Sequence, residues 1–125
     1  MPKIKINEKY IGEDFPCYTI AEAGANHDGE LKKAIKLIDA ANEANSDSIK
    51  FQTYDASKLA SKYSPKYWID DKPDETQYEV FSNLDGLSDD NWKEIFEYAK
   101  SKSVTCFSTP FDERSVDLLY SLDVP

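Results

Sequence analysis

Residues 19–29 read TIAEAGANHDG, a short apolar run that reaches a carboxylate, Glu22, and then breaks into small and turn-forming residues. A helical pattern begins directly after it. This succession predicts a β-strand, a loop and an α-helix. A carboxylate at the carboxyl end of such a strand lies where α/β folds place their chemistry. The stretches SIKFQT (48–53) and TCFSTP (105–110) repeat the arrangement.

The sequence has 125 residues, which is enough for one domain with a hydrophobic core. Its apolar runs are too short to span a bilayer, and we see no secretory or lipidation signal, so we expect a cytoplasmic protein without a membrane partner. The net charge of -9 argues against binding the backbone of a nucleic acid over a broad face. A local lysine in a pocket can still bind a small anion despite this net charge.

Two cysteines, Cys17 and Cys106, lie far apart in the sequence, and there is one histidine. This set is too small for a zinc site. We therefore expect two reduced, buried thiols.

The remaining pattern predicts the order of elements. Apolar residues alternate around a polar turn at 7–9, which predicts an N-terminal hairpin. Strands are expected at 17–23, 48–52 and 104–108, and helices at 30–44, 77–83, 88–102 and 112–122.

Several details of these helices can be predicted as well. The turn at residues 28–29 is expected to cap the first long helix, and Asp112 the last one. Val116, Leu119 and Tyr120 should face inward on that last helix. The long segment 53–87 is rich in aromatic residues, which favours an ordered loop extension over disorder.

The order is therefore a hairpin followed by three βα units. Short connections between helix and strand predict parallel strands with right-handed crossovers. Strands that are apolar on both sides need helices on both faces or closure into a barrel. Three units cannot close a barrel, so we expect residues 1–125 to form the N-terminal part of a longer βα-repeat protein.

Polar residues on these strands suggest a site. Side chains alternate along a strand, so Glu22 shares a face with Ile20, Lys50 with Gln52, and Cys106 with Ser108. We expect a polar pocket inside a barrel, formed by strand residues and closed by loops: Glu22, Lys50, Gln52 and Ser108, with Asn26, His27 and Thr109.

Structural roles remain open for the same residues. Glu22 and Lys50 could be a buried ion pair between strands, which is weak support for stability. His27 could be a surface turn residue, and residues 108–110 could only lead into a helix cap. The tyrosines of the 53–87 segment could serve loop packing.

Three longer stretches together strongly resemble the N-terminal barrel domain of the sialic acid synthase family: IAEAGANHDG (20–29), IDAANEANSDSIKFQTY (38–54) and SVTCFSTPFDERSVDLLYSLDVP (103–125). The family includes N-acetylneuraminate, legionaminate and pseudaminate synthases and spore-coat polysaccharide relatives. The resemblance is weakest at 54–77. It implies an α/β fold that is the N-terminal part of a TIM (β/α)8 barrel. It also implies a homodimer in which an antifreeze-like C-terminal domain completes the partner's active site.

The resemblance also implies a reaction, in which phosphoenolpyruvate condenses with N-acetylmannosamine or a similar amino sugar to give a sialic-type acid and phosphate. The enol carbon attacks the sugar aldehyde, water adds to the resulting oxocarbenium ion, and phosphate leaves by C–O cleavage. A divalent metal, usually manganese, polarises the aldehyde or activates water. Its histidine ligands are expected beyond residue 125.

Residue roles carry over by position. Glu22 matches the acidic residue that manages protons or orients the reacting groups, Lys50 the lysine that holds phosphoenolpyruvate, and Gln52 a residue that hydrogen-bonds the sugar. Asn26 and His27 match the loop at the pocket floor, and Ser108 and Thr109 belong to the matching Ser-Thr-Pro-Phe loop.

The chain departs from the family pattern in ways that leave alternatives open. A second glutamate and a second lysine would follow residue 125, so the chain alone is expected to be inactive. The sugar-binding asparagine of some members has no counterpart near Lys72, which leaves the sugar undetermined. The alternatives are a related synthase that uses a sugar phosphate, and a non-catalytic module that binds a sugar or a protein.

Overall fold

A three-stranded parallel sheet organises the computed structural model, which describes residues 2–125. The strand order is β3 (Ile20–Gly24), β4 (Ser48–Thr53) and β5 (Thr105–Pro110). Burial alternates from Ile49 to the end of β4: Ile49, Phe51 and Thr53 are buried, and Lys50 and Gln52 are partly exposed. One face of the sheet is therefore packed, and the other is open.

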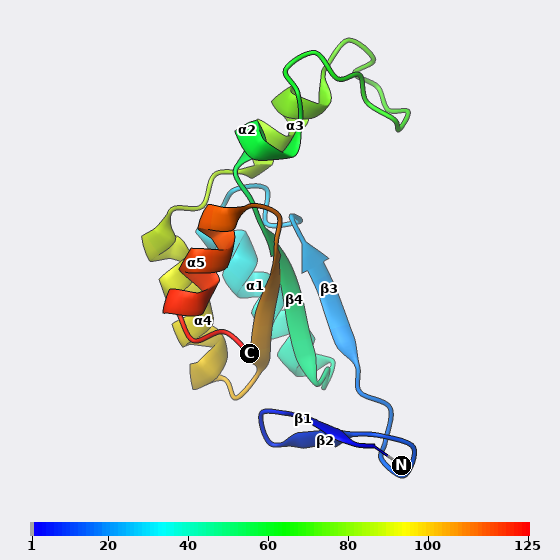
Figure 1. Ribbon diagram of the computed structural model, residues 1–125, viewed down its shortest axis with the longest axis vertical. Helices are drawn as coiled ribbons and strands as arrows, with labels where there is room; N and C mark the ends of the chain where they lie inside the picture. Colours follow the sequence, from blue (N-terminus) through cyan, green and yellow to red (C-terminus); the bar gives the residue numbers. More distant parts are fainter. Residues whose placement is uncertain (1) are drawn as a thin grey trace.

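Helices cover the packed face, as Figure 1 shows for α1, α4 and α5. The helices are α1 (Leu31–Glu43), α2 (Ala56–Leu59), α3 (Gln77–Leu84), α4 (Asp89–Ser101) and α5 (Glu113–Ser121). The predicted order of a hairpin and three βα units is confirmed. The short α2 was missed, because four residues carry no helical periodicity that a sequence pattern can show.

The core forms where α1 and α4 meet β4. Ile38 of α1, Phe51 of β4 and Ile95 of α4 are all fully buried and belong to one cluster. Burying a side chain of this size stabilises the fold by about 1.5–3 kcal/mol. The apolar stripes of the two helices therefore fix which face of the sheet they cover.

Side chains cap two of the long helices, and the cap predicted for α5 is confirmed. Ser88 caps α4, accepting a hydrogen bond from the backbone N–H of Asn91 at 3.2 Å, and Asp112 caps α5. The predicted cap of α1 is wrong. Its N-cap is Glu30, which makes no side-chain cap, while the Asp28 carboxylate instead accepts a hydrogen bond from Lys33 at 2.8 Å.

The N-terminal hairpin forms as predicted from β1 (Ile4–Ile6) and β2 (Lys9–Ile11). Asn7 lies in its turn with φ of 49°, a left-handed conformation that asparagine tolerates better than most residues. Figure 1 places the hairpin beyond the amino ends of the parallel strands.

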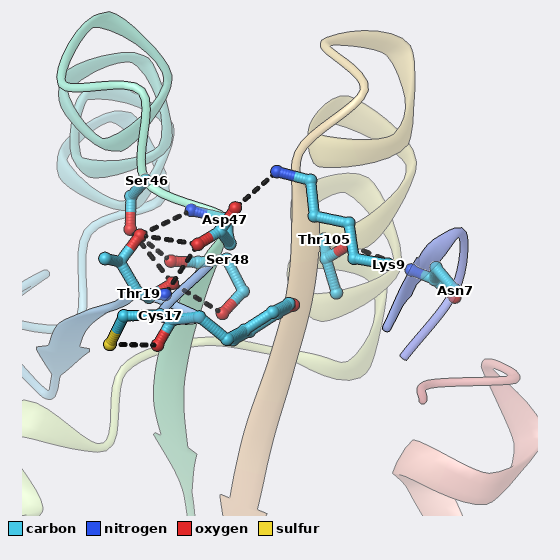
Figure 2. A network of polar contacts seen from close by, with 9 residues as sticks. Asn7, Lys9, Cys17, Thr19, Ser46, Asp47, Ser48 and Thr105 are labelled. Atoms are coloured by element: carbon cyan, nitrogen blue, oxygen red, sulfur yellow. Dashed lines mark hydrogen bonds and ion pairs between the residues drawn. The ribbon is translucent and has the colours of Figure 1, made fainter. Parts of the chain in front are cut away.

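A polar network joins the hairpin to that end of the sheet (Figure 2). The Asn7 side chain donates to Thr105 Oγ1 at 3.0 Å, and Lys9 pairs with Asp47. Asp47 also accepts from the backbone N–H and the hydroxyl of Thr19, at 2.6 and 2.8 Å. These bonds come from three separate segments, so they dock the hairpin on the fold.

The 53–87 segment extends beyond the carboxyl ends of the strands (Figure 1). It is ordered, as predicted. It contains α2 and α3, a β-bridge between Pro65 and Thr76, and a lysine, Lys66, that pairs with Asp70 at 2.5 Å and with Glu75 at 3.8 Å. The Lys66 side chain is only 4% exposed, so its charge is compensated inside the loop.

Two further expectations are wrong near β3, the first strand of the parallel sheet. β3 begins at Ile20, because the backbone N–H of Thr19 bonds to the Asp47 side chain rather than to a neighbouring strand. Cys17 is therefore in a connecting segment and is exposed. Cys106 is free and buried as predicted, and burial raises the pKa of its thiol to about 12.

The predicted inward face of α5 is also partly wrong. Leu119 is buried, together with Ser115, but Val116 and Tyr120 are exposed. Ser115 and Leu119, which are four residues apart, therefore form the buried side of the helix. The side of α5 that carries Val116 and Tyr120 is exposed.

Candidate functional site

Glu22 and Lys50 lie side by side on the open face of the sheet. They are register partners in the β3–β4 pair, and Lys50 Nζ is 2.9 Å from Glu22 Oε2. The Lys50 side chain is 32% exposed and that of Glu22 52% exposed. The two residues therefore form an ion pair between strands, but the pair is accessible rather than buried.

Gln52 joins this pair from the next position on the same face of β4. Gly24, with φ of 54°, leaves room beside it: a Cβ at residue 24 would lie 3.6 Å from Glu22 Oε1 and 3.9 Å from Gln52 Oε1. Thr109 is the register partner of Gln52 and shares its face. The structure thus brings Glu22, Lys50, Gln52 and Thr109 together near the carboxyl ends of the strands.

Ser108 does not belong to this group, so its predicted place beside Lys50 is wrong. It is the register partner of Phe51, and this position turns it toward the helices. Its hydroxyl lies 2.6 Å from Thr53 Oγ1 in the buried layer. Side chains alternate along a strand, so Thr109 faces the site and Ser108 cannot.

The loop after β3 separates the two residues predicted at the pocket floor. Asn26 is exposed. His27 is only 3% exposed, with its ring 5.8 Å from that of Trp92 and 6.1 Å from that of Phe51, so the alternative of a surface turn residue is wrong. Burial lowers the pKa of His27, and the nearby Asp28 only partly opposes this effect.

Residues that the sequence analysis missed complete this region. Phe107 lies in register with Lys50, and the alternation from Thr105 through Phe107 to Thr109 would have predicted it. Tyr54 and Asp85 share a small cavity with His27. No local pattern predicts that contact, because Asp85 reaches the cavity only through the path of the long extension.

The open-face group can bind an anion but cannot hold a metal by itself. The ammonium group of Lys50 offers a charge, and the side chains of Gln52 and Thr109 offer neutral hydrogen bonds. Within residues 2–125 there is no group of three or more histidine, cysteine or acidic side chains that could hold a metal ion. A manganese ion beside this group would therefore need ligands other than these residues.

No helix in the described part of the chain is both long and apolar enough to cross a membrane.

The fold and the site define an α/β protein that presents a charged and polar group where its parallel strands end. Residues 37–125 match the model of the NeuB family. The chain belongs to the NeuB family.

Named relatives agree with this assignment. The chain is 42% identical over 124 residues to N,N'-diacetyllegionaminic acid synthase of Legionella pneumophila, covering 96% of this chain and 35% of the relative. It is 37% identical over 122 residues to the spore coat polysaccharide biosynthesis protein SpsE of Bacillus subtilis, covering 97% and 32%. The chain spans about a third of the length of the curated relatives it matches.

A solved structure shows the same fold. The N-acetylneuraminic acid synthetase of Leptospira borgpetersenii superposes with a TM-score of 0.82 at 27% sequence identity. The superposition covers 98% of this chain and 39% of the other.

Proposed function

We propose that this chain is part of an enzyme that condenses phosphoenolpyruvate with an N-acetylated amino sugar to give a sialic-type acid and phosphate. The observation that carries the proposal is the Glu22–Lys50 pair at 2.9 Å, accessible and beside Gln52. Membership of the NeuB family and relatives named as sialic-type acid synthases support it.

The proposal includes the wider architecture. Residues 1–125 would supply the first three βα units of a TIM barrel, with their open face toward the barrel interior. Ile20, which is 48% exposed on that face, would be covered by later strands. The rest of the barrel, an antifreeze-like C-terminal domain and a homodimer would complete the enzyme. Any manganese ion would need ligands from outside the described residues.

Each side chain has a role that follows from its chemistry. The Lys50 ammonium group would bind the carboxylate or phosphate of phosphoenolpyruvate, and Glu22 would hold that ammonium in place. Gln52 and Thr109 would hydrogen-bond the sugar.

The bond changes balance without an outside reagent. The enol carbon bonds to the aldehyde carbon, and the aldehyde oxygen takes a proton. Water, the third reactant, adds to the oxocarbenium carbon and loses a proton. The new hydroxyl group then loses its proton and forms the C=O bond, while phosphate leaves with the electron pair of the broken C–O bond. Glu22 would pass or accept one of these protons.

The lysines of the extension favour an unphosphorylated sugar over a sugar phosphate. A phosphosugar would need a free basic cluster. Lys66 is paired with Asp70 and Glu75 inside the loop and is nearly fully buried. The other lysines of the segment, Lys58, Lys62 and Lys72, are spread along it.

The reaction itself tests the proposal. The full-length protein should release phosphate only when phosphoenolpyruvate and an N-acetylated amino sugar are both present with manganese, and mass spectrometry should find the condensed nine-carbon acid or its analogue. Reactions that lack either substrate serve as controls. Phosphate release from phosphoenolpyruvate alone, or a clear preference for a phosphorylated aldose, would contradict the assignment.

A further inference from the structure

A small cavity lies behind the open-face group, between the loop after β3, the end of β4 and the connection from α3 to α4. Its volume is about 10 Å³. Four residues with polar side chains line it together with Trp92 and two leucines: His27, Gln52, Tyr54, Asp85, Leu84 and Leu87. A water molecule needs about 10–15 Å³ and two to four polar partners. The cavity is therefore the size of one water and too small for any larger ligand.

His27 lines this cavity and carries a buried hydrogen-bond donor. Its Nδ1 accepts from the backbone N–H of Gly29 at 3.0 Å, so Nδ1 carries no proton. The neutral ring must then carry its proton on Nε2. Nε2 is buried and has no hydrogen-bond partner among the described residues. A buried donor without a partner is rare in native proteins and costs free energy.

The hydroxyl group of Tyr54 is a second buried polar group without a hydrogen-bond partner within residues 2–125. The Tyr54 ring packs edge-on against those of Phe81 and Phe111. Burial and the nearby charge of Asp85 raise the pKa of Tyr54 to about 12, so the hydroxyl keeps its proton. Asp85 is itself fixed, since its Oδ2 accepts from the backbone N–H of Ala56 at 3.0 Å.

We infer that this cavity is a binding site for one ordered water molecule. The water accepts the Nε2–H of His27 and hydrogen-bonds the Tyr54 hydroxyl, and its own protons face the oxygens of Gln52 and Asp85. It satisfies both unpartnered atoms at once and ties the loop after β3 to β4 and to the α3–α4 connection. The inference rests on geometry and stands independently of the proposed function.

Replacing Tyr54 by phenylalanine tests the site by the sign of its effect. The Tyr54→Phe variant keeps the ring and loses the hydroxyl. If the hydroxyl bonds to a buried water, the folding equilibrium constant of the full-length protein should fall by roughly fivefold in urea denaturation. If the hydroxyl is dry and unpaired, the variant should be as stable as the parent or more stable, which would overturn the inference. Tyr63→Phe is the control, because Tyr63 is 89% exposed.

A crystal structure of the full-length protein at high resolution gives a direct view. We expect a single water peak within hydrogen-bond distance of both His27 Nε2 and Tyr54 Oη, and its loss or weakening in Tyr54→Phe. An empty cavity, or a direct bond between those two atoms, would overturn the inference.

Discussion

One residue step along β5 separates two hydroxyl side chains with opposite surroundings. Ser108 lies under the helices with its Oγ 2.6 Å from Thr53 Oγ1. Thr109 lies on the open face as the register partner of Gln52. The first hydroxyl is therefore part of the buried layer, and the second is available to a ligand.

Substituting these two residues should separate stability from binding. Ser108→Ala leaves the Thr53 hydroxyl buried without its partner, so it should lower the free energy of unfolding by about 1–2 kcal/mol and leave KM values unchanged. Thr109→Val should raise the KM for the sugar severalfold, with little effect on stability. Urea denaturation and steady-state kinetics measure both. A Ser108→Ala variant with normal stability but a raised KM would show that Ser108 belongs to the binding site.

At this scale the sequence could predict part of the site. Alternation along β4 places Lys50 and Gln52 on one face, and the structure confirms it. Which residues of β5 share a face with Lys50 depends on the register between β4 and β5, and that register depends on how the helices pack. In the observed register, Ser108 lies on the face that the helices cover. The burial of His27 depends on Phe51 and Trp92, which are distant in sequence, so turn chemistry alone gave no sign of it.

Among the elements, the hairpin is docked through the Asn7–Thr105 hydrogen bond and through one acidic side chain, Asp47. Asp47 accepts hydrogen bonds from Thr19 and pairs with Lys9, and its side chain is only 17% exposed. The hydrogen bond from Lys9, with those from Thr19, lowers the pKa of Asp47 to about 2. A carboxylate whose pKa is lower in the folded state stabilises the fold above its unfolded pKa.

Removing this carboxylate should loosen the hairpin. Asp47→Ala should lower the free energy of unfolding by about 2 kcal/mol, because charged hydrogen bonds are lost. Amide hydrogen exchange should rise most at residues 4–11. In the parent protein the contribution of Asp47 should be full above pH 4 and fall as pH drops from about 3.8 toward 2.

A matched control comes from an exposed acid. Asp71→Ala removes the same charge from a side chain that makes no hydrogen bond or ion pair within the described residues, and it should be close to neutral. Equal losses in both variants would show that net charge, rather than the network in Figure 2, explains the effect.

The hairpin shows where prediction of elements from sequence succeeds and stops. Alternating apolar residues around a polar turn are local, so the hairpin could be predicted. Its docking uses Asp47 and Thr105, which are distant in the chain, and no short-range pattern contains them. The early start predicted for β3 failed for the same reason, since Thr19 bonds to the Asp47 side chain.

Across the whole molecule, the open face of the sheet carries the site but only part of what the proposed reaction requires. Glu22 and Lys50 are accessible there, and the chain spans about a third of its curated relatives. The long family-like stretches made the fold class predictable. The extension at 54–77 was the weakest part of the resemblance, and its α2 was missed.

The 125-residue segment alone should bind the proposed ligands poorly. Calorimetry with manganese chloride should show no stoichiometric site, because residues 2–125 offer no cluster of three metal-binding side chains. Phosphoenolpyruvate should bind weakly, through Lys50 only. The full-length protein, measured in the same buffer, is the control. Tight one-to-one manganese binding to the segment would refute the placement of the ligands outside it.

The central claim is that Lys50, held by Glu22, binds phosphoenolpyruvate, and steady-state kinetics of full-length Lys50→Met tests it most directly. We expect the KM for phosphoenolpyruvate to rise at least roughly thirtyfold while the KM for the sugar changes little. Lys36→Met, at an exposed lysine of α1, should match the parent. A Lys50→Met enzyme with an unchanged KM for phosphoenolpyruvate and only reduced stability would show that the ion pair is structural and contradict the account.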